Sequence, residues 1–189
     1  MILPVLPYGH PMLRQKGARI DTVTLTVKKL VADMLETMYA SKGIGLAAQQ
    51  VGQPLQLTVL DVRGVTDRPS MIECQGIPAE LADFMPMTLI NPVVKSVGDP
   101  VTGPEGCLSF PEIFADISRK ETVDVTALNE KGQRIQFRCG GLLARAIQHE
   151  TDHLHGILFI DRMTREKKAE VQAELDKLQA ETKAALKKK

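Results

Sequence analysis

The segment His149-Glu150-Thr151-Asp152-His153 limits the possible folds and functions of this chain more than any other feature. Histidines four residues apart lie one turn apart on the same helix face, so both imidazole rings can reach one metal ion. Glu150 can approach a water beside that ion without being a ligand itself. Apolar flanking residues indicate a mostly buried helix, where unpartnered histidines and a carboxylate would be costly. We therefore predict a metal site on this helix. The apolar flanking residues are Leu142, Leu143, Ala146, Ile147, Leu154 and Ile157.

A catalytic metal site of this kind needs a third protein ligand and one open position for water. The chain has three cysteines, Cys74, Cys107 and Cys139. Cys107 lies in a short predicted loop at 104–109, whereas Cys74 falls in an irregular segment and Cys139 ends a predicted strand. The last two are better explained as small apolar filler. Spacing therefore favours Cys107 as the third ligand without excluding the others.

The composition is that of an ordinary globular protein. The chain has 189 residues, of which 43% are apolar and 25% charged, and its formal net charge is +1. This length fits one domain, and the charge gives no case for nucleic acid as a substrate. The odd number of cysteines argues against a disulfide framework. No apolar run approaches the roughly 20 residues that a bilayer requires, and no leader segment is recognisable. We expect a cytoplasmic protein that makes no membrane contact.

The N-terminal third is expected to hold an arm, a helix and a strand. Residues 1–20 are rich in proline and predict an extended, wrapping arm. Apolar residues at helical spacing predict a helix over about 21–43, capped by Asp21 or Thr22. Alternation of apolar and polar residues predicts a strand over 55–62.

The middle of the chain is expected to be richer in strands. Residues 64–88 contain scattered prolines and a glycine, which predict a surface loop. A strand is expected over 93–97. Two alternating segments, 122–128 and 134–139, are joined by residues that favour turns and predict a hairpin.

Two helices are expected near the C-terminus. The first spans 142–155 and carries the predicted metal site. The second runs from about 164 to 185, with an inner face of Val171, Leu175 and Leu178. The mixture lacks βαβ regularity, so we predict an α+β fold in which antiparallel sheets pack around the central metal-binding helix, with an N-terminal and a C-terminal helix. Residues 1–189 would form a single catalytic domain, and 165–189 its C-terminal helix and basic tail.

Residues 43–50, Gly-Ile-Gly-Leu-Ala-Ala-Gln-Gln, are the third notable segment. Its glycines follow a helix rather than a strand, which favours a tight turn that lets backbone approach a ligand over a phosphate-binding loop. Together with Glu-Gly-Cys-Leu-Ser at 105–109 and Gln-His-Glu-Thr-Asp-His at 148–153, this segment resembles the three signature motifs of the peptide deformylases, in the order and spacing of that family. The resemblance begins at Pro-Met-Leu-Arg, 11–14, and runs to the end of the metal helix.

The resemblance implies a metal and a reaction. Cys107, His149 and His153 would bind one divalent ion, typically ferrous iron in the cell, with zinc, nickel or cobalt able to replace it. The reaction would remove the formyl group from the N-terminal formylmethionine of newly made proteins and release formate. The basic C-terminal helix would be a candidate for docking on the ribosome, where such substrates emerge.

The resemblance also assigns catalytic roles. Glu150 would take a proton from water and pass it to the departing amine. The oxyanion that forms needs hydrogen-bond donors, and the family pattern places the side-chain amide of Gln50 and the backbone N–H of Leu108 there.

Substrate contacts follow from the same resemblance. The segment around Ile44 would hold the substrate backbone in an extended form, and an apolar pocket would take the methionine side chain. The substrate-binding residues are expected to be Gly43, Ile44, Gly45, Leu142, Arg145 and Ala146. Arg145 departs from the family pattern, since some relatives have an apolar residue there. Its stem can pack beside methionine, and its charge could influence preference further along the substrate.

Three further positions bear on the site. Glu105 and Arg119 would form an ion pair that steadies the Cys107 loop, with two unrelated surface charges as the alternative. Phe114 stands where some relatives carry a substrate-contacting arginine, so that contact is expected to be absent. The 64–88 segment is longer than in related chains, and its residues suggest no function.

Two rival functions remain open from the sequence. An endopeptidase of the H-E-x-x-H type usually takes its third ligand from downstream of the helix, where Asp161 is the only near carboxylate. A non-catalytic protein that binds metal or formyl-peptides is the second rival. The Glu-Gly-Cys-Leu-Ser motif argues against the first, and the intact catalytic positions argue against the second.

Overall fold

The computed structural model describes residues 1–188. The α-helices are α1 (Leu25–Ala40), α2 (Gly141–Leu154), α3 (Arg165–Glu170) and α4 (Gln172–Leu186). The strands are β1 (Gly45–Ala47), β2 (Leu57–Leu60), β3 (Ser70–Cys74), β4 (Ile77–Pro78), β5 (Met87–Cys107), β6 (Phe110–Leu128) and β7 (Arg134–Gly140). Short 3-10 helices occupy Pro11–Arg14, Ala48–Val51, Leu81–Phe84 and Phe159–Asp161. The α+β prediction is confirmed.

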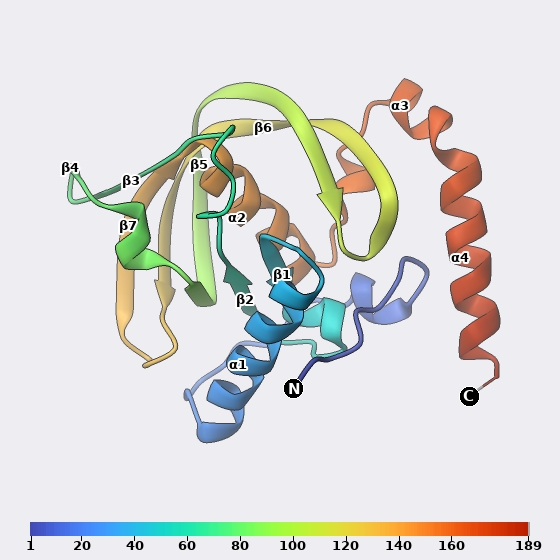
Figure 1. Cartoon of the computed structure of the whole chain (residues 1–189), viewed down its shortest axis with the longest axis horizontal. Coiled ribbons are helices and arrows are strands. Elements are labelled where there is room, and N and C mark those ends of the chain that lie inside the picture. The colour runs from blue at the N-terminus through green and yellow to red at the C-terminus, as the bar shows by residue number, and fades with distance from the viewer. Residues whose placement is uncertain (189) are drawn as a thin grey trace.

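The described strands form one seven-stranded sheet in the order β1-β2-β5-β6-β7-β3-β4, and every neighbouring pair is antiparallel. Its largest feature is the β5–β6 hairpin, which closes where Cys107 faces Phe110. Figure 1 shows this hairpin arching over α2, which occupies the middle of the molecule, while α4 lies along the outer side. The long hairpin therefore brings the predicted cysteine ligand to the helix that carries the histidines.

Helix α1 begins later than the sequence suggested. Neither Asp21 nor Thr22 caps it; the cap is Thr24, whose hydroxyl accepts a hydrogen bond from the N–H of Val27 at 3.4 Å. The predicted apolar face is correct, because Val31, Met34 and Met38 are buried against β1 and β2. The periodic pattern thus identified the helix, but several side chains able to cap it made its first residue ambiguous.

The prediction of a surface loop over 64–88 is correct about the surface, because most of these residues are exposed or half-buried, but wrong about the loop. This segment contains β3, β4 and a short helical turn, and β3 pairs with β7 so that Ile72 lies opposite Cys139. Ile72, Met85 and Met87 are buried in the core that also covers one face of α2. Cross-strand pairing with β7 imposes a strand that the scattered prolines and glycine concealed.

Two other boundaries differ from expectation. The strand predicted over 93–97 is part of the much longer β5. Pro100 lies at a shift in its register with β6, and both Pro100 and Pro104 lie beyond the residues that pair with β2, where β5 has strand β6 on one side only. The single C-terminal helix is two helices that meet at Val171. Val171, Leu175 and Leu178 do pack against one core cluster, as predicted.

The N-terminal arm is extended, as predicted, and links the two loops that carry candidate site residues. The N–H of Leu6 donates to the carbonyl of Gln50 at 2.7 Å, and the N–H of Tyr8 donates to the carbonyl of Ser109 at 2.8 Å. Because one short segment bonds to both loops, it fixes their separation. Among residues 1–188, no helix is long and apolar enough to cross a membrane.

Candidate metal centre

The turn between β5 and β6 and the middle of α2 bring Cys107, His149 and His153 together. Their ligand atoms all lie within 4.8 Å of one another, and Cys107 Sγ is 3.4 Å from His153 Nε2. Both histidines are buried, while Cys107 is half-buried. The other cysteines lie outside this cluster, and burial raises the pKa of the Cys139 thiol to about 12, as expected for apolar filler.

This geometry suits a divalent ion. In a tetrahedral site with metal–nitrogen bonds near 2.0 Å and a metal–sulfur bond near 2.3 Å, ligand atoms lie roughly 3.3–3.6 Å apart. The Sγ–Nε2 separation of 3.4 Å falls in that range. Burial also lowers the pKa of His153 well below its ordinary value, which keeps its imidazole neutral, as a metal requires. Three ligands leave one position open, which is typical of catalytic rather than structural sites.

The ring orientation of His149 is set by Glu105. His149 Nδ1 lies 2.9 Å from Glu105 Oε2. Burial opposes ionisation of Glu105, but hydrogen bonds with His149 and Arg119 outweigh it and lower the pKa of this carboxyl to about 2. An ionised carboxylate can only accept, so Nδ1–H must be the donor, and Nε2 is left for the metal.

The predicted ion pair between Glu105 and Arg119 is present. Its two hydrogen bonds, from Arg119 Nε and Nη2, are 2.6 and 2.9 Å long, and both side chains are buried. Arg119 also donates to Asp152 at 2.8 Å, and Asp152 in turn pairs with Arg162. Sequence reasoning missed Asp152, although it lies inside the motif at 149–153 on a mostly buried helix, where a carboxylate needs a partner.

Glu150 lies on the cavity side of α2 against the backbone of Gly45. A β-carbon at position 45 would lie 2.9 Å from Glu150 Cδ, so only glycine leaves room for the carboxylate. Burial raises the pKa of Glu150 to about 7. Its Oε2 is buried and has no hydrogen-bond partner within residues 1–188. The carboxylate therefore lies ready to accept or donate a proton, with one oxygen free.

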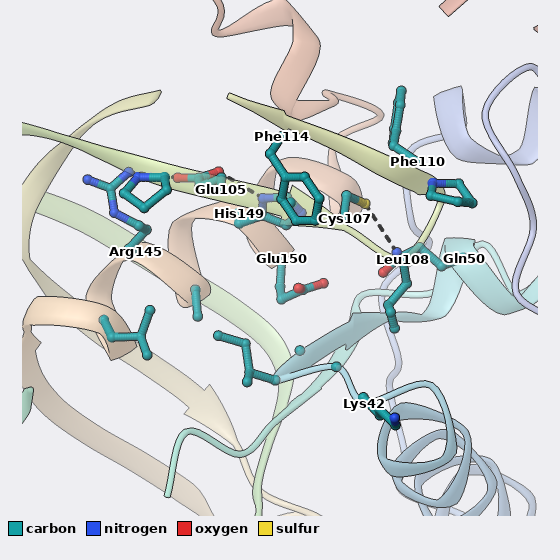
Figure 2. A pocket seen from close by; sticks show the side chains of 18 of the residues that line it. Lys42, Gln50, Glu105, Cys107, Leu108, Phe110, Phe114, Arg145, His149 and Glu150 are labelled. Carbon is teal, nitrogen blue, oxygen red and sulfur yellow. Dashed lines mark hydrogen bonds and ion pairs between the residues drawn. The ribbon is translucent and has the colours of Figure 1, made fainter. Parts of the chain in front are cut away.

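Gln50 and Leu108 lie beside the cluster. Gln50 Oε1 accepts from the N–H of Ala47 at 2.8 Å, which turns its Nε2 toward Cys107 Sγ at 3.5 Å and Ser109 Oγ at 3.3 Å. Leu108 follows the cysteine and lines the same cavity (Figure 2). The amide is thus preset in one orientation with its donor toward the cluster.

A cavity of about 460 Å³ opens onto these residues. Its lining includes every residue predicted to contact substrate, namely Gly43, Ile44, Gly45, Leu142, Arg145 and Ala146. It also includes Lys42, Arg68, Glu112 and Phe114. Lys42, Arg68 and Glu112 did not stand out in the sequence, because exposed charges carry no pattern that marks them.

The charge of Arg145 is directed away from a possible substrate. Its guanidinium donates to Glu105 Oε1 at 2.9 Å and to the carbonyls of Ile117 and Val101 at 2.7 and 2.6 Å. Figure 2 shows it beside Glu105, at the opposite end of the cavity from Lys42. Arg145 therefore ties α2 to the hairpin and has little charge to offer a ligand.

Three features together define a metal-dependent hydrolase. These are the Cys-His-His cluster, which leaves one coordination position open, the buried carboxylate beside it, and the cavity that leads to both. The chain matches the model of the family described as Polypeptide deformylase over residues 2–169. It is 46% identical over 178 residues to a peptide deformylase from Methylacidiphilum infernorum, covering 94% of this chain and 93% of that protein. The chain therefore belongs to the peptide deformylase family, whose members remove the N-formyl group from nascent peptides.

Solved structures agree with this assignment. The peptide deformylase from Thermus thermophilus superimposes with a TM-score of 0.80 at 33% identity, covering 96% of this chain and 99% of that one. The enzyme from Legionella pneumophila gives a TM-score of 0.77 at 32% identity, covering 94% and 95%. The likeness thus spans the sheet, α2 and the metal cluster.

We predict that Glu105→Gln weakens metal binding by about 10–100-fold, because the neutral amide no longer fixes the His149 ring through a charged hydrogen bond. Competition with a chromogenic chelator measures this affinity. Glu181→Gln, an exposed change on α4, is the matched control and should leave the affinity unaltered. Equal affinities for a folded Glu105→Gln variant and the parent chain would show that the contact does not support the metal.

Proposed function

We propose that this chain hydrolyses the formyl amide of N-formylmethionyl peptides at the Cys107, His149 and His153 cluster, with Glu150 as the proton carrier. The observation that carries the proposal is the convergence of these three ligands, the buried Glu150 and the preset Gln50 amide on one cavity. A divalent ion held by the three ligands would supply Lewis acidity, which lowers the pKa of water and polarises a carbonyl.

The chain's own residues carry the remaining steps. Glu150 receives the proton that water loses as it attacks the formyl carbon, and then delivers it to the nitrogen of the departing amine. The formyl oxygen gains negative charge during the attack. Gln50 Nε2 and the backbone N–H of Leu108 donate hydrogen bonds to that oxygen, and because Ala47 already fixes the Gln50 amide, no reorientation is needed. The C–N bond breaks, leaving formate and a free N-terminus.

Substrate orientation follows from the cavity lining. An extended peptide beside Gly43 and Gly45 can pair with exposed backbone, because β1 is the edge strand of the sheet. Ile44, Leu142 and Ala146 provide apolar surface for the methionine side chain. A β-carbon at position 43 would lie 2.7 Å from Leu108 Cδ1, so any larger residue there requires the Leu108 side chain to move.

We propose ferrous iron as the ion used in the cell. Two imidazoles and one thiolate form a borderline-soft ligand set that iron and zinc both accept, and nickel or cobalt can replace them. The resemblance of the three motifs favours iron. We further propose that the chain acts in the cytoplasm on nascent chains and docks on the ribosome through α4, which carries the exposed residues Lys177 and Lys183 and ends beside the exposed Lys187.

Formate release from formyl-Met-Ala-Ser tests the activity. Protein purified without oxygen should release one formate per peptide and contain one metal ion per chain, with iron prevailing in the metal analysis of the same sample. Cleavage of internal peptide bonds instead would identify an endopeptidase. Bound metal without turnover would identify a protein that only binds formyl-peptides or metal.

Removal of the Glu150 carboxylate tests the proton carrier. We expect Glu150→Gln to lower kcat by about 10²–10⁴-fold, the usual contribution of a positioned proton-transfer group. Metal content should stay at the parent value, because Glu150 is not a ligand. Glu174→Gln on the exposed side of α4 is the control. Near-parental turnover by the Glu150 variant would rule out the assigned role.

Charge removal on α4 tests the ribosome contact better than deletion does, because Leu175 and Thr182 of this helix are buried. We expect Lys177→Gln, Lys183→Gln and Lys187→Gln together to weaken co-sedimentation with ribosomes several-fold at low salt while formate release from the free peptide stays unchanged. Undiminished co-sedimentation would remove α4 as the docking element.

A further inference from the structure

Two cations at the mouth of the cavity have no role in the proposed reaction. Lys42 and Arg68 both line the cavity and are both exposed. Neither forms an ion pair with any residue of the described range 1–188. Arg145, the third cation of the lining, is paired with Glu105. Lys42 and Arg68 are therefore the lining cations whose charge is available to a ligand.

Lys42 is held in an unusual backbone conformation. It follows α1 with a φ of +56°, in the left-handed region that glycine normally occupies after a helix. A side chain with a β-carbon is strained in that region. Lys42 therefore lies in the tight turn between α1 and β1, and its side chain lines the cavity just before the strand expected to bind substrate.

Arg68 reaches the cavity from the 64–88 segment. The next residue, Pro69, accepts a hydrogen bond at its carbonyl from the N–H of Leu142 at 3.2 Å, and Ser70 Oγ accepts one from the N–H of Leu143 at 3.0 Å. These bonds fix the segment against the first turn of α2, beside a residue expected to contact the methionine side chain. The segment thus adds a charged side chain to the rim of the site.

The direction of β1 relates these cations to a position in the substrate. The chain runs from Lys42 through Gly43 and Gly45 toward Gln50, so the formyl end lies near Gln50 and the peptide leaves past Lys42. A strand advances about 3.3 Å per residue, and Lys42 precedes Gly45 by three positions in the sequence. A substrate with its methionine beside Gly45 would therefore place its third residue beside Gly43, which directly follows Lys42.

We infer that Lys42 and Arg68, here called the basic rim, favour formylated peptides that carry an acidic side chain at their third residue. This inference rests on the proposed function. Glu112 also lines the cavity, is exposed, and forms no ion pair within residues 1–188, so its negative charge must be considered beside the basic rim. It lies on β6, in the same part of the hairpin as Phe110 and Phe114. Figure 2 shows Lys42 across the cavity from Phe114, which belongs to the same strand, β6, as Glu112.

Two peptides that differ in one charge test the basic rim. Formyl-Met-Ala-Glu-amide and formyl-Met-Ala-Gln-amide have nearly the same shape, and amidation removes the terminal carboxylate. For the parent chain at low salt we expect kcat/KM to be about three- to tenfold higher for the Glu peptide, since exposed ion pairs contribute modestly. The preference should shrink toward unity at about 1 M salt, where exposed charges are screened.

Variants assign the preference to the two residues. The double variant Lys42→Gln with Arg68→Gln should reduce the Glu-to-Gln ratio to about one, and Lys42→Glu with Arg68→Glu should invert it. Lys131→Gln, an exposed change in the β6–β7 turn, should leave the ratio at the parent value. A parent ratio near one, or an undiminished ratio in the double variant, overturns the basic rim while formate release sustains the proposed function. Absence of formate release from both peptides overturns the proposed function and this inference with it.

Discussion

The carboxylate of Glu105 holds together the three segments that build the site. It accepts two hydrogen bonds from Arg119 on β6, one from Arg145 on α2 and one from the imidazole of His149. Loss of any of these partners would strongly destabilise the folded protein, because a buried carboxylate would be left without full compensation of its charge. Because it is fully paired, it instead fixes the distance between the end of β5, which carries Cys107, and the helix that carries the histidines.

This arrangement separates orientation from chemistry. Glu105, Arg119 and Asp152 are buried and act behind the metal ligands, where they orient them. Glu150 and Gln50 face the cavity and are held by different contacts, a glycine backbone in one case and the N–H of Ala47 in the other. The network that positions the ligands can therefore stay rigid while the residues on the cavity side meet water and substrate.

Local patterns in the sequence predicted most of the site residues but not the contacts that join them. The histidine spacing on an apolar helix predicted two ligands, and the deformylase motifs indicated Cys107, Glu150 and Gln50, since these depend on short segments. The Asp152 contact and the direction of Arg145 depend on β5 and β6 meeting α2, which no short segment encodes. The same holds for β3, which pairs with the distant β7, and for the full length of β5, where pairing along the long hairpin with β6 overrides prolines and glycines that locally favour a loop.

The contact between Gly45 and Glu150 has a consequence for inhibitors. Any other amino acid at position 45 places a β-carbon against the carboxylate and displaces it. A compound that hydrogen-bonds to the backbone of Gly45 would thus rely on a residue that cannot be exchanged without moving Glu150. On the role proposed for Glu150, resistance through substitution at that position would cost the cell the very activity that the compound blocks.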